Sequence, residues 1–225
     1  MSERILVVIA HSDDETISMG GTIRKHVDQG DKVCVLSMTD GVSARLASSK
    51  ADVIERKKAS NKASDILGFD WLDCYDFEDN QMDAYPLLEI VKSIEVTKHH
   101  YKPSLVYTHS SADLNVDHRV VSSAVLTAFR PQPGEICKEI RLFEVASATD
   151  YGNSKITGLF APNLFVDISE KWAEKHKALN AYSREMKDYP HSRSIESIKN
   201  LAKIRGNQVG YHLAEAFEVI RKLVD

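Results

Sequence analysis

The sequence predicts an α/β protein, a Rossmann-like three-layer sandwich in which helices cover both faces of one mostly parallel sheet. Two observations support this prediction. Apolar runs of strand length alternate with segments of helical periodicity along the first 130 residues, and such a βαβα order is typical of an open parallel sheet. The run Arg4–Ile9 is continuously apolar after its first residue, as expected for a strand buried on both faces.

The other elements are expected in order along the chain. Strands are predicted at Lys32–Met38, Phe69–Tyr75 and Ser104–Thr108, with further extended segments at Arg141–Ala146 and Asn163–Asp167. Helices are predicted at 16–29, 51–67, 85–100 and 117–129, and then at about 169–186 and 194–224. Gly30 and Gly68 are suitable helix stops, and Pro103 ends the third helix. Because no linker rich in Pro, Gly or Ser divides the chain, residues 1–225 are expected to form a single domain.

Charge and composition exclude several classes of partner. A formal net charge of −4 gives no basic footprint, so we expect neither nucleic acid nor an anionic membrane surface as partner. The apolar run Ile5–Ala10 is far too short to span a bilayer and lacks the flanks of a signal peptide. Cys34 and Cys74 lie in apolar strand-like segments, so we expect buried reduced thiols in a cytoplasmic protein.

Ionisable side chains crowd the end of the first strand, which runs directly into His11-Ser12-Asp13-Asp14-Glu15. Open α/β folds bind their ligands at this end of a strand. Like charges so close together repel unless a cation neutralises them or a proton is shared, and histidine and carboxylate are suitable zinc ligands. The alternative is that Asp13 and Asp14 merely cap the next helix, whose first turn favours negative charge.

A second cluster follows the fourth strand, where Thr108-His109 leads into a segment that ends in Asp117-His118 at the start of a helix. In the predicted sheet, both clusters lie on the same edge. One His and one Asp from the first cluster and one His from the second would leave a fourth position for water, as in catalytic zinc sites. Asp117 is expected either to orient a ligand histidine or to cap its helix, and His109 could also support a ligand.

These motifs resemble those of the PIG-L/LmbE-type de-N-acetylases. That family opens with Ala-His-Pro-Asp-Asp-Glu after a strand, matched here by Ala10–Glu15 with Ser12 in place of proline. Its second motif ends in Asp-His, matched by Asp117-His118. Further family landmarks are matched by Thr39-Asp40-Gly41, by Arg56 and by Asp79-Asn80. The resemblance therefore covers nearly the whole chain.

The resemblance implies a zinc-dependent hydrolase that removes the acetyl group from a small N-acetylated amino sugar, GlcNAc-like and linked to a nucleotide, a lipid carrier or another aglycone. It implies that the zinc ligands are His11, Asp14 and His118. Asp13 would be the general base that takes a proton from the metal-bound water. Fe²⁺ or Mn²⁺ could occupy the same donor set, because occupancy also follows supply.

Two further positions depart from the family pattern. Many relatives carry a second histidine where this chain has Asn115, whose amide can donate to an oxyanion but cannot act as acid or base. A tyrosine of some relatives is replaced by Asp113.

Substrate contacts are also implied by the resemblance. Arg56 would bind hydroxyl, carboxylate or phosphate groups, and Asp79 would bind sugar hydroxyls. The loop that carries His191 and Arg193 could close over the site. For each of these residues, the alternative is a solvated surface position.

Other functions stay open. The chain could be a metal-dependent amidase of a non-sugar N-acyl compound, or a metal-binding relative without catalysis, although the presence of Asp13 argues against the latter. A nucleotide-binding Rossmann domain is disfavoured because G-x-G-x-x-G is absent after the first strand. Some relatives form trimers or hexamers, so the resemblance also leaves a homo-oligomer open.

Overall fold

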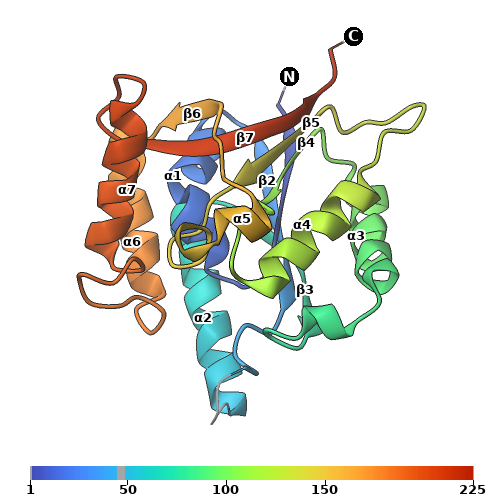
Figure 1. Ribbon diagram of the computed structural model, residues 1–225, viewed down its shortest axis with the longest axis horizontal. Helices are drawn as coiled ribbons and strands as arrows, with labels where there is room; N and C mark the ends of the chain where they lie inside the picture. The colour runs from blue at the N-terminus through green and yellow to red at the C-terminus, as the bar shows by residue number, and fades with distance from the viewer. Residues whose placement is uncertain (1, 45–48, 225) are drawn as a thin grey trace.

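Figure 1 shows the computed structural model, which describes residues 2–44 and 49–224. Its centre is a seven-stranded sheet with the order β3-β2-β1-β4-β5-β7-β6. The first five strands along the chain pair in parallel, whereas β7 runs antiparallel to its neighbours β5 and β6. The predicted α/β fold with a mostly parallel sheet is confirmed.

The strands are β1 (Arg4–Ile9), β2 (Lys32–Thr39), β3 (Asp70–Phe77), β4 (Leu105–His109), β5 (Glu139–Phe143), β6 (Leu164–Asp167) and β7 (Ala214–Lys222). The helices are α1 (Asp14–Asp28), α2 (Lys50–Leu67), α3 (Leu87–Tyr101), α4 (Val116–Ala128), α5 (Ser154–Thr157), α6 (Trp172–Ala181) and α7 (Ile195–Asn207). Short 3₁₀ helices lie at η1 (Met82–Ala84), η2 (Thr149–Tyr151) and η3 (Ser169–Lys171).

Strand β1 divides the protein core into two layers. Its residues Ile5, Val7 and Ile9 pack on one face with apolar side chains of α1, α2 and α6. The alternate residues of β1 face the other way and pack with α3 and α4. Figure 1 shows these two helical layers on opposite sides of the sheet. A strand covered on both faces explains why its sequence is continuously apolar.

The predicted helix at 194–224 is wrong in its second half. Helix α7 ends at Asn207, and the chain turns through Gly210, whose φ is +82°, into strand β7. Gly206 permits this reversal, because a Cβ there would lie 2.5 Å from the carbonyl oxygen of Tyr211. From residue 214 onward the chain forms strand β7, which is buried from Ala214 to Phe217 and becomes more exposed toward Lys222.

Three smaller predictions also needed correction. The segment 169–186 is not one helix but η3 followed by α6, which ends at Ala181. The extended segment Arg141–Ala146 is strand β5, which begins two residues earlier and ends at Phe143. Cys34 is buried as expected, whereas Cys74, on the edge strand β3, is exposed.

Helix α1 is broken at Met19, where φ is −140° and ψ is 23°. The N–H groups of Gly21 and Thr22 after the break donate to the carboxylate of Glu215 at 3.0 and 2.7 Å. Lys175 Nζ lies 2.6 Å from the same carboxylate, and both charged side chains are buried. A side chain from the last strand therefore supplies the acceptors that the interrupted helix lacks.

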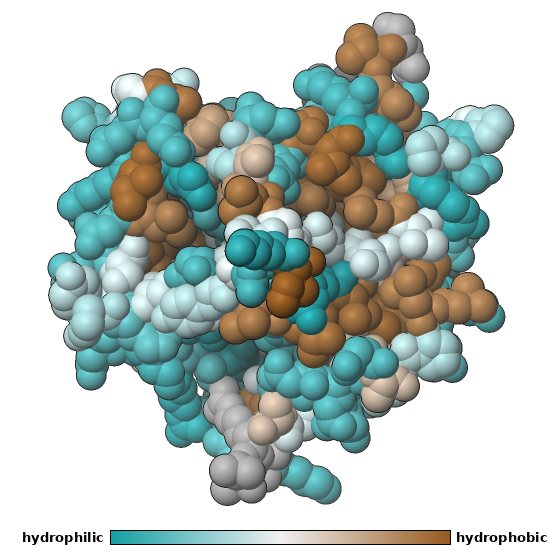
Figure 2. All heavy atoms as spheres, viewed as in Figure 1, coloured by the Kyte–Doolittle hydropathy of each residue, from teal (hydrophilic) through white to brown (hydrophobic). Residues whose placement is uncertain are grey.

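The surface mixes hydrophilic and apolar side chains. Figure 2 shows apolar side chains gathered over the region of α4 and α5, while hydrophilic side chains cover much of the rest of this face. The strongly exposed apolar residues of this part of the sequence include Leu114, Ile156 and Leu159. Within residues 2–44 and 49–224, no helix combines the length and the apolar character needed to cross a bilayer.

Candidate metal and catalytic site

The two motif-bearing loops meet because β1 and β4 are neighbours in the sheet. The strands pair in parallel, with Ile5 opposite Leu105, so that both end on the same edge. Beyond β1 the chain turns directly into α1, and beyond β4 it reaches α4 after a short loop. Strand β2 lies on the other side of β1, so the site occupies the switch point at which open α/β folds place their ligands.

His11, Asp14 and His118 converge at this edge. The Nδ1 atom of His11 lies 3.3 Å from Asp14 Oδ2, and His118 Nε2 lies 3.4 Å from the same oxygen. The two ring nitrogens are 3.2 Å apart. All three side chains are buried, and together they form a group that could hold a metal ion.

Carboxylates hold the opposite nitrogen of each histidine ring. His11 Nε2 lies 3.1 Å from Asp79 Oδ1 and 3.2 Å from Asp117 Oδ2. His118 Nδ1 lies 3.1 Å from Asp113 Oδ2. A ring nitrogen that faces a carboxylate carries the proton, as is usual for metal-bound histidines. The lone pairs of His11 Nδ1 and His118 Nε2 therefore point inward.

This arrangement fits a cation. The inward lone pairs of His11 and His118 face Asp14 Oδ2, and electron-rich atoms so close together repel unless a positive charge lies among them. Asp14 Oδ1 is buried and has no hydrogen-bond partner among the described residues. Burial lowers the pKa of His118, but the carboxylates of Asp14 and Asp113 outweigh this effect and raise the pKa to about 9. Two histidines and one carboxylate suit zinc with an open coordination position.

Asp117 holds His11 and is itself held firmly. Its Oδ2 accepts the backbone N–H of Asn80 at 2.7 Å, and its Oδ1 accepts that of Met82 at 3.1 Å. His11, Asp79 and Asp117 also lie close enough together to form a second candidate metal group. Because these backbone donors and the outer N–H of His11 already occupy the carboxylate of Asp117, we interpret it as the group that orients His11.

Asp13 lies beside the ligand group, completely buried between two arginines. Its Oδ1 is 3.0 Å from Arg56 Nη2, and its Oδ2 is 3.4 Å from Arg193 Nη1. Asp13 precedes α1, but its side chain makes no capping hydrogen bond. The alternative that Asp13 merely caps the helix is therefore wrong. Burial raises the pKa of Asp13, and the two guanidinium groups oppose that rise.

Arg56 is buried on the inner face of α2, so the alternative of a solvated position is wrong. Besides contacting Asp13, its Nη1 lies 2.7 Å from Glu185 Oε1, and its Nε donates to Ser12 Oγ at 3.2 Å. Ser12, which replaces the proline of the family motif, thus supplies an acceptor that proline lacks. Nothing in the local sequence around Glu185 signalled this ion pair.

A pocket of about 270 Å³ opens beside His11, Asp13 and Arg56, and we call it the candidate catalytic pocket. It is lined by His11, Asp13, Gly41, Ala44, Arg56, Asp79, Asn80, Asn115, Glu185 and Arg193. Asp14 and His118 do not line it. His191, predicted to bind substrate, is exposed outside this lining, and its Nδ1 accepts the N–H of Arg193 at 2.9 Å.

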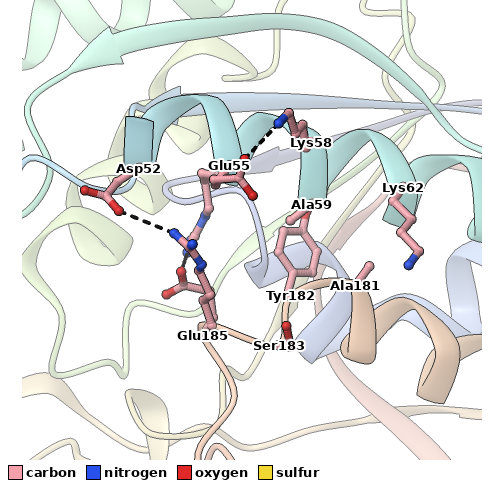
Figure 3. A pocket seen from close by; sticks show the side chains of 11 residues that line it. Asp52, Glu55, Lys58, Ala59, Lys62, Ala181, Tyr182, Ser183 and Glu185 are labelled. Carbon is pink, nitrogen blue, oxygen red and sulfur yellow. Dashed lines mark hydrogen bonds and ion pairs between the residues drawn. The ribbon is translucent and has the colours of Figure 1, made fainter. Parts of the chain in front are cut away.

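A second cavity of about 200 Å³ lies behind the ion pair of Arg56 and Glu185, which line both spaces. Figure 3 shows this cavity between helix α2, which carries Glu55 and Lys58, and the segment around Tyr182. The buried ion pair therefore forms part of the wall between the candidate catalytic pocket and its neighbour.

Hydrogen-bonded amides form one rim of the candidate catalytic pocket. Asn115 accepts the N–H of Asp117 at 2.8 Å, which caps α4, and its Nδ2 donates to Asn80 Oδ1 at 3.2 Å. Asn80 Nδ2 donates in turn to Asp79 Oδ1 at 3.0 Å. Asn80 has a φ of 56°, which is uncommon outside glycine. Asp79 is buried, so it is not a solvated loop acid.

His109 packs beneath the ligand group. Its ring stacks on that of His118 with centroids 4.0 Å apart, and its Nε2 accepts the N–H of Ala10 at 2.9 Å. Burial is the main cause that holds the pKa of His109 well below its ordinary value. The ring is therefore neutral and supports the site by packing.

A parallel α/β sheet with a candidate His₂Asp metal group at its switch point and a buried carboxylate beside it fits the class of metal-dependent hydrolases. Residues 6–129 match the PIG-L family, described as GlcNAc-PI de-N-acetylase. The match spans more than half of the sequence, and the chain belongs to this family of de-N-acetylases.

Comparisons with individual proteins agree with this assignment. The probable N-acetyl-α-D-glucosaminyl L-malate deacetylase 2 of Bacillus cereus is 29% identical over 189 residues, which cover 81% of this chain and 83% of the relative. The N,N′-diacetylchitobiose deacetylase of Pyrococcus horikoshii shares the fold with a TM-score of 0.76 at 22% identity, over 97% of this chain and 84% of that chain.

The same fold also occurs with another activity. GalB, the 4-carboxy-2-hydroxymuconate hydratase of Pseudomonas putida KT2440, has a TM-score of 0.77 at 20% identity, over 100% of this chain and 98% of that chain. At this level of identity the likeness shows the fold alone. The reaction depends on the residues of the site and not on the fold.

Proposed function

We propose that this chain is a single-domain, zinc-dependent de-N-acetylase of a small N-acetylated amino sugar. The observation that carries the proposal is the convergence of His11, Asp14 and His118, with carboxylates on the outer nitrogens of both rings and Asp13 alongside. When bound, zinc would lower the pKa of a water molecule and polarise the amide carbonyl.

Asp13 is the proposed general base. Its carboxylate would accept the proton of the attacking water and then return that proton to the nitrogen of the leaving amine. Arg56 and Arg193 each contact one of its oxygens, so the orientation of the carboxylate is fixed before substrate arrives. Burial, which raises the pKa of Asp13, favours proton uptake at the step that requires it.

The rim residues support a sugar as substrate. Asp79, Asn80 and Asn115 line the pocket and offer amide donors and carboxylate and carbonyl acceptors within one small area. Such a mixed set suits the hydroxyl groups of a sugar ring, each of which both donates and accepts. The family match and the deacetylase relatives support the same substrate class.

The experiment that tests this function measures acetate release from a panel of compounds. The panel contains N-acetylglucosaminyl malate, diacetylchitobiose, a nucleotide-linked N-acetylglucosamine and, as the non-sugar alternative, an N-acetyl amino acid. We expect release from at least one amino sugar, loss of release with a chelator, and recovery when zinc is restored; Fe²⁺ and Mn²⁺ are compared in parallel. Release from the amino acid alone, or activity that survives metal removal, would contradict the proposal.

A further inference from the structure

Loop 144–151, which follows strand β5, contacts both sides of the catalytic apparatus from outside it. The structure describes the whole loop, and none of its residues lines the candidate catalytic pocket. Two of its hydroxyl groups nevertheless reach functional side chains. Thr149 donates a hydrogen bond to Asp113, which contacts the proposed ligand His118. Ser147 accepts a hydrogen bond from Arg193, which contacts Asp13.

On the metal side, the contact runs through Asp113. Thr149 Oγ1 donates to Asp113 Oδ2 at 2.8 Å, and this oxygen also faces His118 Nδ1 at 3.1 Å. The other oxygen of Asp113 accepts the N–H of Asn115 at 2.8 Å. Thr149 is itself fixed, because its hydroxyl oxygen accepts the N–H of Val145 at 2.8 Å. The orientation of His118 therefore depends on a hydroxyl group two contacts away.

On the base side, the contact runs through Arg193. The Nε of Arg193 donates to Ser147 Oγ at 2.9 Å, and its Nη1 lies 3.4 Å from Asp13 Oδ2. The N–H of Ser147 donates to Ser192 Oγ at 3.1 Å. Ser147 has a φ of 70°, in the left-handed region that residues other than glycine seldom adopt. This strained backbone presents both polar groups of Ser147 to the segment that carries Arg193.

We propose that loop 144–151 is the positioning element of this active site, with Thr149 fixing His118 through Asp113 and Ser147 fixing Arg193 against Asp13. Both are positioning residues, since neither touches the reacting atoms. The inference rests on the proposed function for the roles of His118 and Asp13. It adds that one loop outside the pocket controls metal binding and proton transfer through two separable contacts.

The metal side is tested by measuring the zinc dissociation constant of the whole protein by competition with a chelator. Thr149→Val removes the hydroxyl and keeps the shape, whereas Thr149→Ser keeps the hydroxyl and serves as the matched control. We expect the valine variant to bind zinc about 10-fold more weakly, at the low end for groups that support a metal ligand, and the serine variant to match the wild type. Wild-type zinc affinity in the valine variant would overturn the role of Thr149.

The base side is tested with Ser147→Ala and Ser147→Gly. Both remove the acceptor for Arg193, but only glycine also relieves the strained backbone. If Ser147 positions Arg193, kcat falls by about 10-fold or more in both variants, because small misplacements of catalytic groups are costly, while zinc affinity is unchanged. Near wild-type kcat in the glycine variant would show that the backbone alone matters and would overturn the role of Ser147.

The two sets of variants together separate the inference from the function on which it rests. Weakened zinc binding in Thr149→Val supports the proposed role of Thr149 in metal binding, whatever the substrate. If no acetate is released from any amino sugar, the proposed function fails while this role of Thr149 stands. Equal losses of zinc affinity and of kcat in the Thr149 and Ser147 variants would show general loosening of the loop. That outcome would overturn the inference while leaving the proposed function intact.

Discussion

The Nε2 atom of His118 lies 3.2 Å from the Nδ1 atom of His11, although the two residues are 107 positions apart in the sequence. Each ring turns its other nitrogen toward a carboxylate, so neither ring can rotate without breaking a hydrogen bond. The two rings are therefore already oriented for one cation. Binding of that cation does not have to include the entropic cost of ordering the histidine side chains.

Replacing His118 by alanine is expected to abolish stoichiometric metal binding, because only His11 and Asp14 would remain of the three converging ligands. Metal content is measured by elemental analysis after dialysis against metal-free buffer. His100→Ala, an exposed position near the end of α3, is the matched control and should keep its metal. One equivalent of metal in His118→Ala would show that the ligand set is wrong.

Replacing Asp13 by asparagine is expected to leave metal binding intact and to lower kcat by about 10²- to 10⁴-fold, the range for loss of a general base. The amide has the shape of the carboxylate but cannot accept the proton. Metal content and kcat are measured on the same preparation. Activity close to that of the wild type would remove Asp13 from the role of base.

Replacing Lys175 by methionine is expected to lower the free energy of unfolding by about 3–5 kcal/mol, because Glu215 would keep a buried charge without its partner. The two side chains are only 2% and 3% exposed. Urea unfolding gives the value, with Lys203→Met on the exposed side of α7 as control. Adding Glu215→Gln should recover part of the loss, and strict additivity of the two changes would argue against the pairing.

His26 is expected to make the fold less stable as the pH falls below about 6.5, the ordinary pKa of histidine. Burial is the main cause that lowers its pKa in the folded protein, with Arg141 adding to the effect and Asp31 opposing it. Below pH 6.5 the unfolded chain therefore binds the proton first, and the free energy of unfolding declines until the folded pKa is reached.

Urea unfolding between pH 5 and 7.5 measures this effect in the wild type and in His26→Gln. Because the two proteins differ only at residue 26, the difference between the two curves reports the contribution of His26 and its contact with Asp31. The glutamine variant should lose less stability over this range. Parallel curves would mean that His26 has the same pKa in the folded and unfolded states.

The sheet and the positions of the ligand group were predictable because local sequence determines them. A continuously apolar β1 required cover on both faces, and parallel neighbours must end on one edge, which brings His11 and His118 together. Strand β7 was not predictable from the same signals. Its residues show no strict alternation of polar and apolar side chains, and the boundary with α7 depends on a glycine-mediated turn.

The supporting contacts were not predictable, because they arise from packing between distant segments. Thr149 meets Asp113 and Glu185 meets Arg56 only in the folded chain, and no sequence period relates the members of either pair. For Asn115, the sequence motif allowed an oxyanion donor, and the structure adds a helix cap and a bond to Asn80. The role of Asn115 as a hydrogen-bond donor to the oxyanion stays a prediction.

The placement of β4 beside β1 determines when the chain can bind a metal ion as it folds. Of the segments between them in the chain, α2 and α3 cover the two faces of the sheet and β3 forms its far edge, so none of these three lies between β1 and β4. A chain synthesised only as far as residue 104 contains two of the three donors but not the strand that delivers the third. Metal binding during refolding should therefore occur only after β4 has paired with β1. The time course of metal binding, followed with a metal-sensitive dye, would measure when this pairing forms.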